Sequence, residues 1–203
     1  ENIILTNSWK RYTLSSTSLS QLVLRLRGDQ STNKSCTIYV WGAQVEQGHA
    51  TSYIPTYAGT STRLADTCTD AGDATIFNDS EGVLYMEIQA LSDDATYRLI
   101  SISDGSNNKI TLGYSNQNNA LIAQIISGGS NVVNLEPINV SDITDFNKIA
   151  FSYKTNDCKV YVNGSLVATD TSATMPTGLN QLNFDYAYAL DFYGRCKDLR
   201  YYD

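Results

Sequence analysis

The sequence has little of what metal and nucleophile chemistry needs. It contains one histidine, His49, and four cysteines that stand far apart: Cys36, Cys68, Cys158 and Cys196. A zinc site usually draws on closely spaced Cys and His pairs, so we exclude one. A catalytic triad would need a nucleophile and an orienting group beside His49, and nothing in the sequence places them. We expect free thiols, with two disulfides as the alternative in an oxidising compartment.

Long apolar runs and an excess of positive charge are also missing. No apolar stretch approaches the roughly 20 residues that a bilayer-spanning helix needs, so we expect no membrane insertion. The net charge is −7, and Lys and Arg form no cluster, so we expect no nucleic-acid partner. Residue 1 is Glu rather than Met, so we expect a processed or excised piece.

What the sequence does contain is typical of an all-β protein. Asn, Ser, Thr and Gly are abundant and there are 14 tyrosines. The clearest stretch is 146–168, where Ile149, Phe151 and Tyr153 alternate with polar or small residues, as in a half-buried strand. Asn163-Gly164 predicts a type I′ hairpin, because both central residues of that turn need positive φ.

Strand patterns recur at short, regular spacing from residue 74 onward, which is typical of a sandwich or barrel. One short helical turn is predicted at Ser141–Asp145. The predicted strands are Gly82–Ala90, Tyr97–Ser103, Lys109–Tyr114, Asn119–Ser127, Asn131–Leu135, Lys148–Lys154, Lys159–Asn163, Ser165–Thr169, Gln181–Phe184 and Phe192–Tyr202.

The first part of the chain also carries strand patterns. Gln21–Arg27 alternates apolar and polar residues, and Cys36–Val45 is apolar on both faces, which predicts a strand covered on both sides. Residues 57–73 are rich in Gly, Thr, Ser and Asp and have no strand pattern. We therefore predict terminal strands of a β segment over 1–56, a linker over 57–73 and a sandwich domain over 74–203.

Two phrases of the first segment resemble a known type of module. They are WKRYTL at 9–14 and WGAQVEQGHATSYIPT at 41–56. Both resemble the closing strands of carbohydrate-binding-module-like jelly rolls that are common in phage tail and prophage proteins. Because a few strands without a partner sheet are marginal alone, we expect this segment to pack on the rest of the chain, on sister chains or on a piece removed upstream.

The later segment resembles the concanavalin A-like (laminin G-like) lectin/glucanase sandwich. The resemblance is carried by four phrases in order: GVLYMEIQA, FNKIAFSYKTNDCKVYVNGSLVATD, LNQLNF and FYGRCKDLRYYD. It implies an antiparallel β-sandwich of the jelly-roll type. Together with the first segment, the resemblance suggests a phage tail fibre, tailspike or prophage protein, and such appendages are typically trimeric.

The catalytic pattern of the glucanase relatives is not met. Those enzymes place paired carboxylates on one strand, roughly 5–10 Å apart, in an E-x-D-x-x-E type of spacing. The comparable strand here, Tyr85–Gln89, holds only Glu87, and no two glutamates of the chain are suitably spaced in sequence. We therefore expect no enzymatic activity.

Sugar binding needs flat aromatic faces and polar groups that grip hydroxyls. Three places offer both kinds of group, although tyrosines in all-β proteins most often pack across strands. The candidate ligand-binding residues are Asp185, Tyr186 and Tyr188, then Tyr114 and Asn116, and Tyr97.

Calcium is implied only by the resemblance, since some laminin G-like relatives hold it. Asp104, Asn107 and Asn108 are the candidate ligands, because calcium takes oxygen donors, but a turn explains these residues equally well. No other cofactor is expected.

These observations lead to a functional expectation. We expect a non-catalytic domain of a virion tail that recognises glycan on the host cell surface, as a homotrimer whose copies make weak single sites strong. The alternative is a structural spacer or trimerisation module of the fibre. A glycan hydrolase with an unfamiliar acid pair ranks third.

Overall fold

The computed structural model describes residues 6–14, 37–46, 50, 52–56, 59–61, 68–186 and 190–203. The chain divides into two compact units, 1–64 and 65–203. The division falls between the predicted boundaries at residues 56 and 73.

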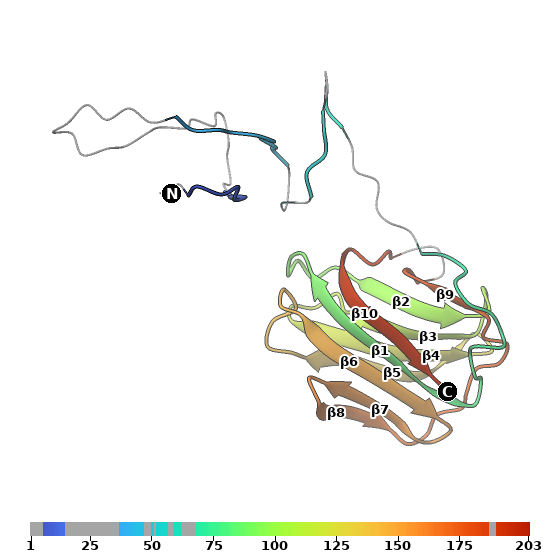
Figure 1. Cartoon of the computed structure of the whole chain (residues 1–203). Coiled ribbons are helices and arrows are strands. Elements are labelled where there is room, and N and C mark those ends of the chain that lie inside the picture. The colour runs from blue at the N-terminus through green and yellow to red at the C-terminus, as the bar shows by residue number, and fades with distance from the viewer. Residues whose placement is uncertain are drawn as a thin grey trace. The chain divides into compact units, whose positions relative to one another are not determined.

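The second unit is a β-sandwich of two antiparallel five-stranded sheets (Figure 1). The first sheet has the order β10-β1-β6-β7-β8, with bounds β10 Gly194–Tyr202, β1 Glu81–Ala90, β6 Asn147–Lys154, β7 Cys158–Val162 and β8 Ser165–Asp170. The second has the order β5-β4-β3-β2-β9, with bounds β5 Ser130–Asn139, β4 Ala120–Ser127, β3 Lys109–Tyr114, β2 Arg98–Ser103 and β9 Gln181–Asn183. The predicted fold class is confirmed.

The described residues contain no helix, and so none that is long and apolar enough to cross a membrane. The predicted helical turn at Ser141–Asp145 is an isolated turn, in which the Asp142 carboxylate accepts hydrogen bonds from the backbone and hydroxyl of Thr144. A short polar side chain that bonds its own turn competes with helix formation, which is the physical reason for the difference.

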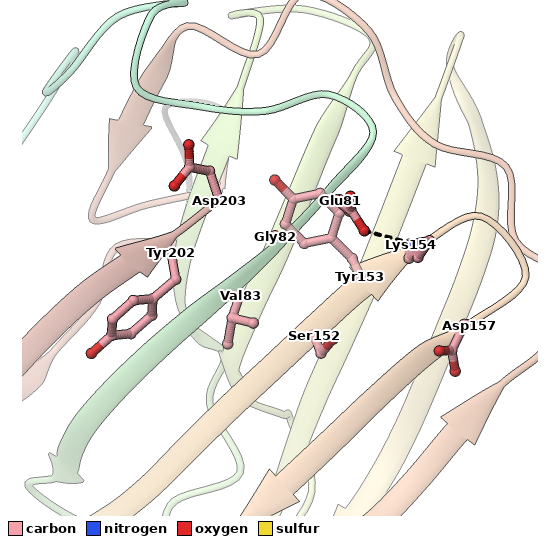
Figure 2. Close-up of a pocket in the computed structure, with 9 residues that line it drawn as sticks. All are labelled: Glu81, Gly82, Val83, Ser152, Tyr153, Lys154, Asp157, Tyr202 and Asp203. Carbon is pink, nitrogen blue, oxygen red and sulfur yellow. Dashed lines mark ion pairs between the residues drawn. The ribbon is translucent and has the colours of Figure 1, made fainter.

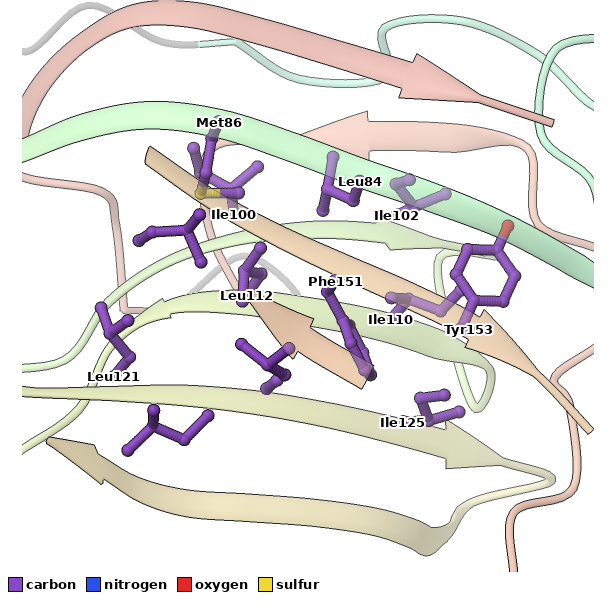
Figure 3. Close-up of a cluster of buried hydrophobic side chains, with 14 of the residues drawn as sticks. Leu84, Met86, Ile100, Ile102, Ile110, Leu112, Leu121, Ile125, Phe151 and Tyr153 are labelled. Atoms are coloured by element: carbon purple, nitrogen blue, oxygen red, sulfur yellow. The ribbon is translucent and has the colours of Figure 1, made fainter. Parts of the chain in front are cut away.

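The core lies between the two sheets (Figure 3). Along β1, buried residues alternate with partly exposed ones, so Leu84 and Met86 point inward. Phe151 of β6 lies beside them, and Ile100 and Leu112 face them from the second sheet. Each fully buried side chain of this kind contributes about 1.5–3 kcal/mol, which holds the two sheets together.

The predicted hairpin turn is present between β7 and β8. Asn163 has φ 50° and Gly164 has φ 87°, the backbone conformation that a type I′ turn requires. The Asn163 side chain also accepts a hydrogen bond from the backbone N–H of Lys148, at 2.9 Å. The turn is thereby fixed to the neighbouring strand β6.

Strand β5 is longer than the sequence pattern predicts. The predicted strand ended at Leu135, before Pro137, but the observed strand continues to Asn139. Because β5 is the edge of its sheet, Pro137 removes no ladder hydrogen bond that a neighbour would need. A proline therefore did not mark the end of this strand.

The described residues of the first unit form no strand, so the predicted strand over Cys36–Val45 is wrong for residues 37–45. Instead of being covered on both sides, Tyr39 is 81% exposed and Trp41 is 70% exposed. The Trp41 ring contacts the Tyr53 ring at 4.5 Å between centroids. An alternating pattern gives a strand only where a neighbouring strand completes its hydrogen bonds, and the described residues of this unit supply no such neighbour. The predicted strand at Gln21–Arg27 lies outside the described residues.

The described cysteines are free thiols, as predicted. Cys158 is completely buried on β7 and behaves as a small core residue, and Cys196 is partly buried beside the core. Burial raises the pKa of both thiols, which keeps them protonated. Cys36 and His49 lie outside the described residues.

Candidate functional site

The outer face of the second sheet is unusual because it is buried although it faces away from the core. Alternation along β2 turns Ile100 and Ile102 inward, so Ser101 and Ser103 point outward. Both serines are nevertheless buried. An antiparallel sheet usually leaves such a face to water, so burial here indicates that another part of the chain covers it.

A row of polar side chains crosses this face from edge to edge. The strand registers pair Asn183 with Ser101, Ser101 with Thr111, Thr111 with Gln124, and Gln124 with Asn134. Directly paired residues have side chains about 4.5–5.5 Å apart at Cβ, so the five groups lie in one line. The row is buried over β9, β2 and β3 and becomes accessible at Gln124 and Asn134.

The cover over β2 and β3 comes from the segment that follows β9. The Ser101 hydroxyl donates to the backbone carbonyl of Asp185, at 2.7 Å. The Lys109 ammonium on β3 lies 4.4 Å from the centre of the Tyr186 ring, a cation–π distance. These two contacts hold Asp185 and Tyr186 against the outer face.

Two buried atoms beneath this cover lack hydrogen-bond partners among the described residues. They are Oγ1 of Thr111, which is 0% exposed, and Nδ2 of Asn183, which is 1% exposed. The side-chain amide oxygen of Asn183, Oδ1, does have a partner: it accepts a hydrogen bond from the backbone N–H of Asp70, at 2.6 Å. Each buried polar group without a partner costs about 1–3 kcal/mol, so two in one row are an expensive arrangement.

Lys109 is a desolvated cation at the same end of the face. Burial lowers the pKa of its ammonium, and the nearby carboxylates of Asp104 and Asp185 act in the opposite direction. The lysine therefore stands between an aromatic ring and two carboxylates, and its charge is largely balanced within the protein.

A second bridge crosses the other end of the face. The Tyr97 hydroxyl, just before β2, donates to Oε1 of Glu136 on β5 at 3.1 Å. Burial raises the pKa of Tyr97, and the charge of Glu136 and this hydrogen bond raise it further. By alternation both side chains leave their strands on the outer face, so the bond spans β3 and β4. Gly113 lies between them on β3 and has no side chain to obstruct the bridge.

The structure places three of the predicted ligand-binding residues on this face, two at one end and one at the other, and a fourth in the core. Asp185, Tyr186 and Tyr97 all lie at this face. The prediction for Tyr114 is wrong, because this side chain is completely buried in the core and its hydroxyl donates to the carbonyl of Ile88. Burial raises the pKa of Tyr114 to about 12, which fits a neutral core residue. Asn116 is exposed in the turn after β3 and stays a prediction.

Tyr188 lies outside the described residues. The polar row itself was not predicted, although the sequence held a signal for it. In the strands RLISIS and KITLGY, Ser101 and Thr111 alternate with isoleucine and leucine, which marks a polar second face.

Two of the three predicted calcium ligands, Asp104 and Asn108, make hydrogen bonds within the loop and its neighbouring turn, and the side chain of Asn107 stays a prediction. Asp104 accepts hydrogen bonds from the backbone N–H groups of Ser106 and Asn108 and from the Asn108 side chain. The side-chain oxygen of Asn108, Oδ1, in turn accepts a hydrogen bond from the backbone N–H of Gly128, at 2.8 Å. The described residues hold no group of three or more His, Cys, Asp or Glu side chains suited to a metal ion. Calcium stays a prediction from resemblance.

One pair of carboxylates escaped the sequence reasoning because its members come from different strands. Glu87 of β1 and Asp198 of β10 are directly paired on the outer face of the first sheet. Each already has a cationic partner: Lys197 lies 2.7 Å from Glu87, and Arg200 lies 2.7 Å from Asp198. These two carboxylates are therefore accounted for as members of a surface ion-pair network.

Comparison with protein families gives one match. A family model described as the concanavalin A-like lectin/glucanases superfamily matches residues 83–203, which are 121 of the chain's 203 residues. No curated protein matches the sequence.

Solved structures share the fold at low sequence identity. Domains LG4-5 of the mouse laminin alpha1 chain give a TM-score of 0.50 at 9% identity, over 66% of this chain and 38% of that one. Domain 4 of the arabinanase AbnA from Geobacillus stearothermophilus, solved in complex with arabinotriose, gives 0.50 at 15% identity, over 65% and 64%. A carbohydrate-binding module of Bacillus subtilis gives 0.46 at 11% identity, over 61% and 76%. At these identities the likeness concerns the fold alone.

Proposed function

We propose that this chain, which belongs to the concanavalin A-like lectin/glucanases superfamily, binds glycan on the outer face of its second sheet. The observation that carries the proposal is the polar row, which is accessible at Gln124 and Asn134 and continues to Thr111 and Asn183, where two buried atoms have no hydrogen-bond partner among the described residues. A lectin-type fold alone does not identify which surface binds the ligand. The polar row points to the outer face of the second sheet.

The chemistry of the face suits sugar hydroxyls. Thr111 and Gln124 each offer a donor and an acceptor, the two roles that one hydroxyl can satisfy at once. Tyr186 and Tyr97 add aromatic surface for the apolar C–H face of a sugar ring. We expect the sugar to bind over β4 and β5, where Gln124 and Asn134 are accessible, beside the covered end of the row.

The finer proposal concerns biological context. We propose that the domain recognises host-cell-surface glycan as part of a phage tail fibre or similar virion appendage, as a homotrimer. The support is the resemblance of the WKRYTL and WGAQVEQGHATSYIPT phrases to phage tail modules. Several copies on one particle would turn weak single sites into strong attachment.

We further propose that binding is not followed by hydrolysis. A retaining or inverting glycosidase needs one carboxyl that can donate a proton to the leaving oxygen. The one directly paired set of acidic residues in the described sheets, Glu87 and Asp198, is held by Lys197 and Arg200. A structural spacer module is the other alternative, favoured by the exposed aromatic residues Tyr39 and Trp41 of the first unit.

The experiment is a glycan array with the purified full chain, with and without calcium, alongside Gln124→Ala and Thr169→Ala. Gln124 lies in the polar row, whereas Thr169 is exposed on β8 of the other sheet and serves as the matched control. We expect binding to one polysaccharide class that Gln124→Ala weakens and Thr169→Ala retains. A blank array from a folded oligomer would overturn the proposal in favour of the spacer. Release of new reducing ends from a bound polysaccharide would overturn the non-catalytic part.

A further inference from the structure

A groove lies on the outer face of the opposite sheet, away from the polar row. It runs between β1, β6 and the end of β10 and has a volume of about 360 Å³ (Figure 2). Its lining consists of Glu81, Gly82, Val83, Ser152, Tyr153, Lys154, Asp157, Tyr202 and Asp203. This is within the range of pockets that take small ligands, about 300–1,000 Å³.

The shape of the groove follows from the strand register. Val83 is paired with Ser152 on one side and with Tyr202 on the other, so three neighbouring strands each contribute one outward side chain. Val83 and Ser152 are short and form the floor, while the Tyr202 ring, 49% exposed, forms one wall. Lys154 and Asp157 lie on the side away from Tyr202 (Figure 2). A shallow floor beside an exposed aromatic ring suits the flat apolar face of a pyranose.

One end of the groove is rigid. The Tyr153 hydroxyl donates to the carbonyl of Asn78 at 2.6 Å and lies 2.7 Å from the Tyr201 hydroxyl. Gly82 makes this contact possible, because a Cβ at that position would meet both tyrosine hydroxyls at 2.7 Å. The end wall is therefore preformed, so a ligand would spend little free energy on ordering it.

The charge of the lining is one unit negative once its ion pairs are counted. Lys154 pairs with Glu81 at 2.8 Å, and Asp157 pairs with Lys159 at 2.6 Å. Asp203 has no ion-pair partner among the described residues and leaves one negative charge at the Tyr202 side. A carboxylate next to an aromatic ring attracts a cationic or neutral polar ligand and repels an anionic one.

We propose that this groove is a second glycan contact, which holds one neutral or amine-bearing pyranose against Tyr202 and disfavours acidic sugars. The inference rests on the proposed glycan-binding function and adds a site on the opposite outer face. The sugar ring stacks on Tyr202, its hydroxyls bond Ser152 and the Glu81–Lys154 pair, and an amino group pairs with Asp203. A domain with contacts on both faces can hold two chains, or two parts of one branched chain, which raises the avidity.

The test is a titration of the full chain followed by backbone amide NMR, with three probes at millimolar concentration. The probes are a tetramer of glucosamine, cellotetraose and a trimer of galacturonic acid, which are cationic, neutral and anionic. We expect signals of Val83 and Ser152 to shift with the first two probes and to stay still with the third. Equal shifts with all three probes, or shifts confined to other residues, would overturn the proposal.

Variants sharpen the result. Tyr202→Ala should weaken groove binding about ten-fold, because stacking of this kind is worth roughly 1.4 kcal/mol. Ser152→Phe fills the floor and should abolish it, and Asp203→Asn should remove the preference for glucosamine over cellotetraose. Thr169→Ala, exposed on β8 and outside the groove, is the matched control and should change nothing.

The two proposals can fail separately. Gln124→Ala removes a side chain on the other sheet, so it should leave the groove signals responsive. Array binding that depends on Gln124 while the groove signals never shift would overturn the second contact alone. Groove shifts together with an array indifferent to Gln124→Ala would overturn the first face and keep the second contact.

Discussion

The outer faces of the two sheets differ in how they treat polar groups. On the second sheet, Ser101 and Thr111 are buried beneath Asp185 and Tyr186, and two polar atoms of the row have no hydrogen-bond partner among the described residues. On the first sheet, the polar side chains remain in contact with water and pair with one another, as Glu81 does with Lys154.

The difference matters because solvent sets the strength of polar interactions. A hydrogen bond in a water-poor environment is stronger than one in water, and a missing one is correspondingly more costly. Exposed ion pairs contribute only about 0–1 kcal/mol. We therefore expect the second sheet to supply most of the affinity for glycan and the groove on the first sheet to add avidity.

The largest effect should come from disrupting the hydrophobic core, because both outer faces depend on it. Phe151→Ala takes a completely buried ring out of the core between the sheets. We expect the free energy of unfolding to fall by about 3–5 kcal/mol, and both binding surfaces to be lost together. Urea unfolding and the glycan titration measure the two consequences. Tyr85→Ala, on the outer face of β1, is the control, and loss of one surface with retention of the other would break the comparison.

Replacing the buried Thr111 hydroxyl, which has no hydrogen-bond partner among the described residues, should separate stability from binding. Thr111→Val keeps the side-chain shape and removes the buried oxygen, so we expect the free energy of unfolding to rise by about 1–2 kcal/mol. Glycan binding should be retained in the same variant, because Thr111 is completely buried and the accessible part of the row is at Gln124 and Asn134. Urea unfolding and the glycan titration test both. Ser101→Ala is the contrast: its hydroxyl has a partner, so its loss should destabilise by about 1 kcal/mol. A destabilised Thr111→Val would contradict the cost assigned to the row.

Acid should affect the second sheet through the residues that lead into β2. A hydrogen bond from Arg98 lowers the pKa of Asp94 to about 2, below its unfolded value of roughly 3.9. The stabilisation is therefore fully present above about pH 4 and is lost as the pH falls through about 2. Urea midpoints at pH 5 and pH 2.5 measure it. Asp94→Asn should lower the urea midpoint at pH 5 and reduce the difference between the midpoints at the two pH values. Asp191→Asn, at an exposed position, is the control and should leave the midpoint at pH 5 unchanged.

The smallest effect should come from the exposed pair of the first sheet. In Lys154→Gln the ion pair with Glu81 is lost, but both side chains are more than half exposed. We expect the free energy of unfolding to change by less than about 0.5 kcal/mol, as measured by urea unfolding in low and moderate salt. A fall in the free energy of unfolding above about 1 kcal/mol would contradict the comparison. It would show that polar pairs on the first sheet contribute as much as those on the buried face of the second sheet.

The strands of the second unit were largely predictable, because alternation is a local property of the chain. Each of the ten predicted strands from Gly82 onward corresponds to an observed one, with the clearest extension in β5. The first unit shows the limit of the same reasoning. Its aromatic alternation at 37–45 resembles a strand, but the part of this unit that the structure describes holds no neighbouring strand to pair with it.

The candidate site was predictable only in part. An aromatic residue beside Asp and Asn was a sufficient signal for Asp185 and Tyr186, yet the same signal pointed to Tyr114, which lies in the core. Period-two alternation says which residues share a face of one strand, but it does not say which face is inside. That choice depends on packing against the other sheet.

The sequence by itself therefore determined the fold class, the strand positions and the Asn163-Gly164 hairpin, all of which depend on residues close together in the chain. Only the tertiary structure decided where ligand chemistry gathers. The polar row joins Asn183 to Asn134 through three intervening strands, and the groove joins Val83 to Tyr202 across most of the second unit. The physical reason is that strand order and register are fixed by burial of the whole core, so long-range neighbours appear only once both sheets have packed.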